Sequence, residues 1–260
     1  MKDRHKLHLF CSGDKSALRY IDAQEINSTV FNATTLRINL LAMDFPGEFL
    51  QSQRKVLEES WIQLLPRLDL VTTLSCRHRV DQPFFEAICE MKNLEHLHIL
   101  SSTVEDISSI SKLHKLRFLN IEGFSRLRDI SPILTLKDLR LLSVENSFKV
   151  ENYDVLGQMT ALIGLRLGGN TLSPKNLGLK SLKPFKNLKH LQHLDLTFSS
   201  VIDGSYDTIL ELDSLERFDI SVMISNPIRQ LIKNNNKKLT AGFFMDYDFD
   251  NNMFYEGKEW

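Results

Sequence analysis

The sequence is poor in cysteine and has no excess of either charge. Its three cysteines in 260 residues are an odd number, which argues against a disulfide scaffold and favours a reducing compartment. Lysine and arginine together number 32, against 33 for aspartate and glutamate, so the formal net charge is −1. A general binder of nucleic acid or of acidic membranes usually carries a basic excess. We therefore expect neither nucleic acid nor membrane among the partners.

Long hydrophobic runs are also missing. No segment approaches the roughly 18 apolar residues of a membrane-spanning helix. The first residues, MKDRHKLHLFCSGDK, hold only a short apolar run that His8 interrupts. That run is too short for the hydrophobic region of a secretory signal. These absences predict a cytoplasmic protein, although export by a specialised secretion system would leave no such trace.

Motifs for catalysis and for cofactor binding are absent as well. The sequence has no G-x-S-x-G nucleophile motif, no phosphate-binding loop and no pair of cysteines at zinc spacing. We therefore predict that the protein is not an enzyme and that it holds no cofactor.

What the sequence does contain is a repeated frame, L-x-x-L-x-L. Two stretches show it most clearly, VEDISSISKLHKLRFLNI from Val104 and LRDISPILTLKDLRLLSV from Leu127. Successive frames begin 22 to 24 residues apart, except for a step of 29 between Leu162 and Leu191. The frame recurs, with other apolar residues at some anchors, at Val71/Leu74/Cys76, Leu94/Leu97/Ile99, Leu116/Leu119/Ile121, Leu139/Leu142/Val144, Leu162/Leu165/Leu167, Leu191/Leu194/Leu196, Leu215/Phe218/Ile220 and, with one apolar position missing, Leu239/Gly242/Phe244.

A frame of this kind predicts a short strand with one buried face. Its fourth and sixth positions point to the same side of a strand, so stacked repeats bury them as a continuous ladder that one repeat could not bury alone. Cys76 takes a ladder position and is expected to be buried and unreactive. The rest of each repeat returns the chain, and Asp106 and Asp129 are placed to cap a short helix or turn there.

The cadence of these repeats resembles the 22-residue leucine-rich repeats of the internalin type over about residues 71–220. The resemblance implies an α/β solenoid with a curved parallel β-sheet on the concave face and short helices or turns on the convex face. The family's turn asparagine is matched at Asn170, whereas Ser102 and Ser199 stand at the corresponding place in other repeats. Such solenoids serve unrelated partners, so the resemblance implies a function only as a class.

Residues 1–70 are predicted to cap the first repeat. They contain two degenerate repeats, at Leu7/Leu9 and Leu36/Ile38. They also contain an amphipathic helix, whose apolar face runs from Phe49 through Val56 and Trp61 and which Pro66 ends. A solenoid needs such a cover because its terminal repeat exposes core.

Residues 71–238 are predicted to form the repeats, and residues 239–260 a C-terminal strand or hairpin cap. The alternation of Met245 and Tyr247 with acids indicates a strand that turns at Asn251–Asn252. NNNKK at 234–238 is interpreted as a polar loop. The lysines of the long step are interpreted as a solvated convex surface; they are Lys175, Lys180, Lys183, Lys186 and Lys189.

The variable positions of the strands point away from the ladder, to the concave face of the predicted solenoid, and these positions together form the outer face of the sheet. We predict that a partner protein binds there, because nothing in the fold requires large or charged groups at these positions. Phe118 and Leu141 would form a ridge beside a notch left by Gly164, Gly168 and Gly169. The predicted contact residues are His96, His98, Phe118, Asn120, Glu122, Leu141, Ser143, Glu145, Arg166, His193, Asp195, Arg217 and Asp219.

Paired carboxylates on this face leave a hydrolase as a rival class. Glu122/Glu145 and Asp195/Asp219 are each expected in one column on neighbouring strands, an arrangement similar to the carboxylate pair of a glycosidase. We favour a mixed-charge recognition surface instead, in which Arg166 reaches Glu145 and Arg217 reaches Asp195.

Histidines on the same face raise the question of a metal. His96 and His98 share one strand, but His193 lies four repeats away, about 19 Å at the usual strand spacing. Two histidines alone leave zinc short of ligands, so we predict no metal site.

The sequence thus predicts a non-enzymatic protein-binding module of the adaptor, inhibitor or immunity type. A secreted effector that acts on a host protein is the alternative that the sequence leaves open.

Overall fold

The computed structural model divides the chain into two compact units. The N-terminal unit comprises residues 16–139 together with 147–152, and the C-terminal unit contains residues 140–146 and those from 153 onward. The residues described are 21–23, 26–41, 51–169, 175–220, 224–248 and 253–254. The predictions for Leu7/Leu9, Cys11, Phe49, Asn170 and Asn251–Asn252 lie outside these ranges.

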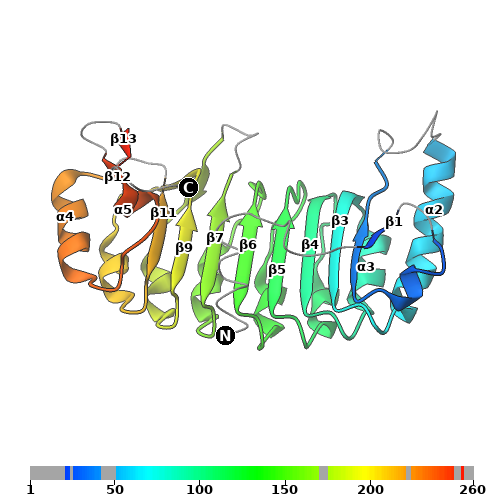
Figure 1. Ribbon diagram of the computed structural model, residues 1–260. Helices are drawn as coiled ribbons and strands as arrows, with labels where there is room; N and C mark the ends of the chain where they lie inside the picture. Colours follow the sequence, from blue (N-terminus) through cyan, green and yellow to red (C-terminus); the bar gives the residue numbers. More distant parts are fainter. Residues whose placement is uncertain are drawn as a thin grey trace. The chain divides into compact units, whose positions relative to one another are not determined.

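Strands of the N-terminal unit form a parallel sheet in chain order (Figure 1). They are β1 (Ile21–Ala23), β2 (Thr35–Ile38), β3 (Thr73–Val80), β4 (His96–Ser102) and β5 (Phe118–Glu122). The ladder anchors meet in register, because Leu74 pairs with Leu36 on one side and with Leu97 on the other, and Leu97 pairs with Leu119. All four leucines are buried. The Leu36/Ile38 segment is therefore paired in register with the first strand of the repeats.

Strands of the C-terminal unit repeat this arrangement. They are β6 (Leu141–Glu145), β7 (Gly164–Gly168), β9 (His193–Leu196) and β11 (Arg217–Ile220). Leu165 pairs with Leu142 and Leu194, and Leu194 pairs with Phe218. These anchors are also buried, so the frame read from the sequence is the frame of the structure.

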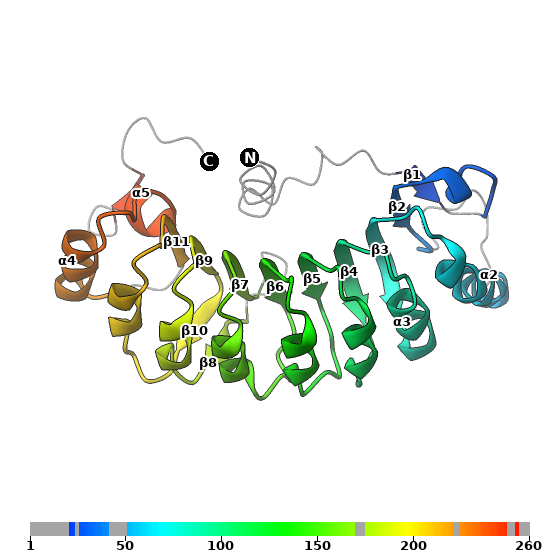
Figure 2. The same cartoon turned by 90° about the horizontal axis from the view of Figure 1, so that it is seen from below.

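The return segments are mostly single turns of 3-10 helix, which lie along one face of the sheet in each unit (Figure 2). Asp106 and Asp129 each accept a hydrogen bond from the backbone N–H two residues on, at 2.8 and 2.7 Å. Each residue thus stabilises the turn that leads into a 3-10 segment, whose N-cap is the following isoleucine, Ile107 or Ile130. Hydrogen bonds from the side chains of Ser108 and Ser131, together with these backbone bonds, hold the pKa of both carboxyl groups below the usual value. The 3-10 segments are η4 (Ser108–Lys112), η5 (Ser131–Thr135), η6 (Tyr153–Gln158), η7 (Lys183–Asn187) and η8 (Asp207–Glu211).

The predicted N-terminal helix is α2 (Gln51–Leu64), and a 3-10 turn that contains Pro66, η3 (Leu65–Arg67), follows it. Trp61 and Leu64 are buried, whereas Val56 is 63% exposed. The buried face is thus narrower than the sequence pattern indicated. Another 3-10 turn, η1 (Val30–Asn32), precedes β2, and α3 (Gln82–Cys89) follows β3.

The long step between Leu162 and Leu191 contains a strand that the ladder does not use. In it β8 (Leu177–Leu179) pairs with β10 (Ser199–Val201) as a separate parallel ribbon. All five lysines of this step are exposed, as the solvated-surface interpretation predicted.

The C-terminal end differs from expectation in its local structure. Residues 234 and 235 close a helix, α4 (Asn226–Asn235), so the polar-loop interpretation of NNNKK was wrong there; Pro227 in its first turn starts this helix favourably. A turn of helix, α5 (Phe243–Asp246), delays the predicted strand to Tyr247. The strand β12 (Tyr247–Asp248) then pairs with β13 (Met253–Phe254) in an antiparallel hairpin. Within the described ranges, no helix has the length and apolar character needed to cross a membrane.

Candidate protein-binding face

Polar side chains of the N-terminal unit line up across strands on the outer face. Thr73 pairs with His96 in the sheet, and Thr73 Oγ1 is hydrogen-bonded to His96 Nδ1 at 2.9 Å. One column along, Ser75 Oγ is hydrogen-bonded to His98 Nδ1 at 3.1 Å. In both histidines, one ring nitrogen is therefore hydrogen-bonded to a side chain of the neighbouring strand β3. Among the described residues, no group of three or more metal-ligating side chains is placed to hold an ion.

Phe118 is the large aromatic of this face in the N-terminal unit. It pairs with His96 in the sheet, and the two rings meet edge to face with centroids 6.2 Å apart. His96, Phe118 and Glu122 are half-buried, whereas His98 and Asn120 are buried. Of the contact residues predicted in this unit, only the three half-buried ones expose side-chain surface that a partner could contact.

Arg166 on β7 is the centre of an ion-pair network in the C-terminal unit. Its Nε donates to Asp195 Oδ2 on β9 at 2.7 Å, and its Nη1 lies 3.7 Å from Glu145 Oε1 on β6. Ser143 Oγ donates to the same Glu145 oxygen at 2.7 Å. The predicted Arg166–Glu145 pair is thus present, and Asp195 completes it on the other side.

The predicted Arg217–Asp195 pair is replaced by a pair within one strand. Arg217 Nε and Nη2 donate to the two carboxylate oxygens of Asp219 at 2.7 and 3.1 Å. Asp219 Oδ2 also lies 3.3 Å from His193 Nε2. Arg217 can reach Asp219 because residues two apart on a strand share a face. The predicted pair with Asp195 does not form because Asp195 is already paired with Arg166.

Asp195 and Asp219 do occupy one column, as the hydrolase alternative required. Each carboxylate, however, is bound to an arginine at 2.7 Å. Both are buried. This arrangement suits a fixed charge network better than a pair that must exchange a proton with a substrate.

Leu141 and the glycine notch differ most from expectation. Leu141 is only 5% exposed, and Ser143 and His193 are buried to 1%. The notch is filled by the chain itself, because a Cβ on Gly168 would lie 2.1 Å from the carbonyl oxygen of Thr197. Gly169 donates its N–H to the carbonyl of Phe198 at 3.1 Å. The space left by Gly168 and Gly169 is therefore filled by the turn after β9 and is not open to a side chain of a partner.

Replacing Gly168 by alanine is therefore expected to lower the free energy of unfolding by about 1–3 kcal/mol, as overpacking against backbone does. Gly178→Ala in β8 is the matched control, since its Cβ would meet only the flexible end of Ile202, at 3.3 Å. Urea denaturation measures both. A larger loss for Gly178→Ala than for Gly168→Ala would show that the close approach at Thr197 is not a constraint.

The described cysteines offer no nucleophile. Cys76 and Cys89 are free and buried. Burial raises the pKa of the Cys76 thiol and raises that of Cys89 to about 12. Because the thiolate is the reactive form, both side chains are inert core residues, as predicted for Cys76.

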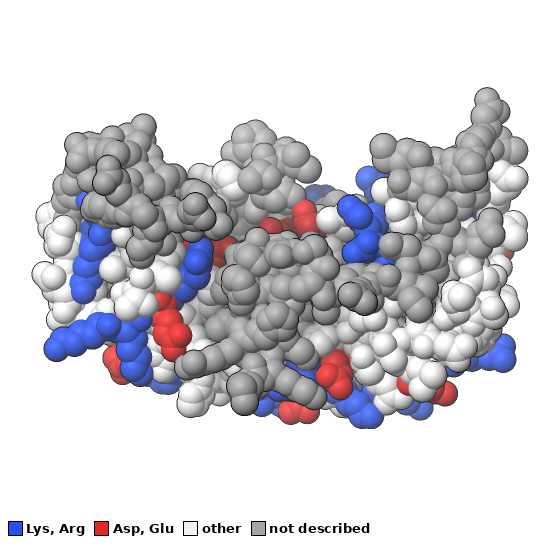
Figure 3. Space-filling view, viewed as in Figure 1, with Lys and Arg blue, Asp and Glu red and all other residues white. Residues whose placement is uncertain are grey.

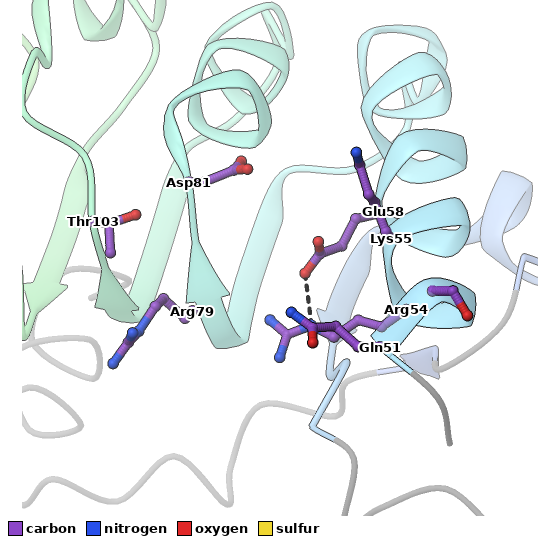
Figure 4. Close-up of a pocket in the computed structure, with 8 residues that line it drawn as sticks. Gln51, Arg54, Lys55, Glu58, Arg79, Asp81 and Thr103 are labelled. Carbon is purple, nitrogen blue, oxygen red and sulfur yellow. Dashed lines mark hydrogen bonds and ion pairs between the residues drawn. The ribbon is translucent and has the colours of Figure 1, made fainter. Parts of the chain in front are cut away.

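One feature of the surface was missed by the sequence reasoning. A hollow of about 750 Å³ lies between the first turns of α2 and the end of β3, lined by charged side chains such as Arg54, Lys55 and Arg79 (Figure 4). The run RHR at 77–79 was the available signal, because its two arginines alternate with a buried histidine. The contribution of α2 could not be read from the sequence.

Parallel strands in register, a buried leucine ladder and 3-10 return segments define a leucine-rich repeat solenoid. No protein-family model matches the sequence, and no curated protein matches it either. Solved structures do resemble it, and internalins are among them. Internalin C2 of Listeria monocytogenes is 16% identical with a TM-score of 0.48, over 68% of this chain and 73% of that one.

Two further structures show the range of proteins with a similar fold. A leucine-rich repeat protein of Leptospira interrogans is 19% identical with a TM-score of 0.48, over 82% of this chain and 58% of that one. The Arabidopsis receptor kinase HAESA, in complex with the peptide hormone IDA and the co-receptor SERK1, is 18% identical with a TM-score of 0.47. That match covers 80% of this chain and 34% of the receptor chain.

Proposed function

We propose that the chain is a non-enzymatic protein-binding module, which recognises a partner protein through the outer face and acts as an adaptor, inhibitor or immunity-type protein. The observation that carries the proposal is the network in which Arg166 is held between Glu145 and Asp195. The leucine ladder on the opposite face stabilises the fold without it.

The energetics of this network support a role in recognition. Taking charges out of water costs several kcal/mol per ion, and apolar residues of similar size often stabilise a protein as well or better. Yet Asp195 is buried and Arg166 and Glu145 are largely so. Side chains fixed in advance lose little entropy when a partner binds. Charges that are arranged in this way set the rate and the specificity of association.

Phe118 supports the same proposal in the N-terminal unit. Its half-buried ring is steadied by His96 but still offers surface. Aromatic residues in such positions often dominate the free energy of protein binding.

The proposal predicts different effects for two variants on a partner captured from the native cell and identified by mass spectrometry. Phe118→Ala should weaken binding by more than about 1 kcal/mol, roughly fivefold in Kd. Glu122→Gln, which removes the charge of a half-buried residue and keeps its shape, should mainly slow association at low salt. Surface plasmon resonance measures both, and circular dichroism checks that each variant is folded.

Lys183→Ala with Lys186→Ala is the matched control, because both lysines are exposed on the return segment η7. If the lysine variant lost binding and Phe118→Ala did not, the outer face would not be the working surface. A partner found only in the lysate of a foreign host would assign the secreted-effector role instead.

A further inference from the structure

The hollow between α2 and β3 is a second polar surface, and it lies within the N-terminal unit. Gln51, Arg54, Lys55 and Glu58 line it from α2 and Arg79 lines it from the end of β3, and in Figure 4 the charged ends of Lys55 and Arg79 extend away from each other. Asp81 and Thr103 complete the described lining. None of the described lining residues is apolar or aromatic, so the hollow suits a charged ligand.

The acids of the hollow are already engaged within the protein. Glu58 accepts a hydrogen bond from Arg54 Nε at 2.8 Å, one helical turn away. The carboxylate of Asp81 accepts the N–H of Phe84 at 3.1 Å and so caps α3. Neither acid needs a cation from outside.

Two of the three cations that line the hollow are in the opposite situation. Lys55 and Arg79 are exposed, and no described residue forms an ion pair or a side-chain hydrogen bond with either of them. Arg77, two residues before Arg79 on β3, is exposed on the same face of the strand. Lys and Arg side chains gather beside β3 in the space-filling view (Figure 3). This corner of the N-terminal unit therefore carries positive charge that no described acidic residue neutralises.

We propose that this hollow binds an acidic peptide segment of a partner protein, with Arg79 and Lys55 as the charged contacts and Arg54 as a third. The inference rests on the proposed function in one respect, that the ligand is a protein. The surface is otherwise separate, because none of its residues belongs to the contact set on the outer face. Guanidinium groups suit carboxylates because they can donate two hydrogen bonds at once.

A peptide fits the hollow better than a nucleic acid does. Single-stranded nucleic acid is held by aromatic side chains on which bases stack, and the described lining has none. Glu58 and Asp81 would also repel a continuous row of phosphates, whereas carboxylates in a peptide can be spaced to avoid them. The balance of 32 basic against 33 acidic residues in the whole chain adds no general attraction for a polyanion.

The test uses the full chain and a fluorescein-labelled peptide of alternating glutamate and serine, read by fluorescence anisotropy at about 20 mM salt, where charges act over roughly 20 Å. Lys55→Gln with Arg79→Gln should weaken binding about tenfold, because each exposed ion pair is worth up to roughly fivefold. Lys183→Gln with Lys186→Gln removes the same charge from exposed positions of the C-terminal unit and should change the affinity less than about twofold.

Four results would overturn the inference. The first is an equal loss of affinity in both double variants. The second is tighter binding of a single-stranded oligonucleotide of equal charge. The third is competition by inorganic phosphate as strong as that of the unlabelled peptide, and the fourth is an anisotropy that does not respond to salt. The measurement needs no cellular partner, so a failure to capture one would count against the outer face and leave this result intact.

Discussion

Leu119→Ala and Leu142→Ala are each expected to lower the free energy of unfolding by about 2–5 kcal/mol. Both side chains are fully buried at ladder positions, Leu119 in the N-terminal unit and Leu142 in the C-terminal unit. Each truncation leaves a cavity between rungs that the paired leucines of neighbouring strands cannot fill. Chemical denaturation of the full chain measures the loss.

Ser143→Ala is the control for the frame, because Ser143 is adjacent to Leu142 and points to the opposite face. Its hydroxyl donates to Glu145 at 2.7 Å, so the loss should be about 1 kcal/mol or less. Similar losses for Leu142→Ala and Ser143→Ala would contradict the assignment of the buried face.

Acidification from pH 7 to pH 4 is expected to destabilise the protein through His78 by roughly 3 kcal/mol. His78 is 1% exposed, and its ring meets Phe84 edge to face at 4.8 Å. Neither ring nitrogen has a hydrogen bond of good geometry among the described residues, and the weak contact with the backbone of Ile38 offsets only part of the effect of burial. Burial lowers the pKa of His78 from 6.5 to about 4, and the charge of Arg54 adds to the shift.

The direction follows from which state binds the proton. Between pH 6.5 and about 4 the unfolded chain protonates this imidazole and the folded chain does not. Stability is therefore present above pH 6.5, is lost as the pH falls towards 4, and is not lost further below it.

His78→Leu isolates this contribution, because leucine fills similar space and does not titrate. The difference in unfolding free energy between wild type and variant, measured by urea denaturation at each pH, should change by roughly 3 kcal/mol across the interval. His114→Gln, which removes an exposed imidazole from the same unit, is the matched control. A difference for His78→Leu that stays constant with pH would mean that the imidazole titrates alike in both states.

The ladder could be predicted because its signal is local and repeated. Leu97 and Leu119 pair in the structure because they hold the same place in successive frames. The run NNNKK at 234–238 predicted a loop because it is polar, but α4 begins further back, at Asn226 and Pro227, and continues into this run.

The outer face was less predictable because its side-chain contacts depend on neighbouring strands and on the turns that pack against it. Gly168 lies close to the carbonyl of Thr197 because of the path of the turn after β9. The repeat spacing does not predict that path. Arg217 pairs with Asp219 in part because Asp195 is already paired with Arg166. The hollow beside Arg79 depends on where α2 lies, and that is a long-range property of the chain.

The long step between Leu162 and Leu191 shows how such a chain tolerates a change in its length during evolution. Its additional residues are diverted into the β8–β10 ribbon, while Leu165 and Leu194 still meet in register. A single residue inserted inside a rung would turn its leucines to the wrong face. Insertions are therefore admissible between rungs and forbidden within them, so new surface can be acquired by lengthening a return segment while every strand keeps its place.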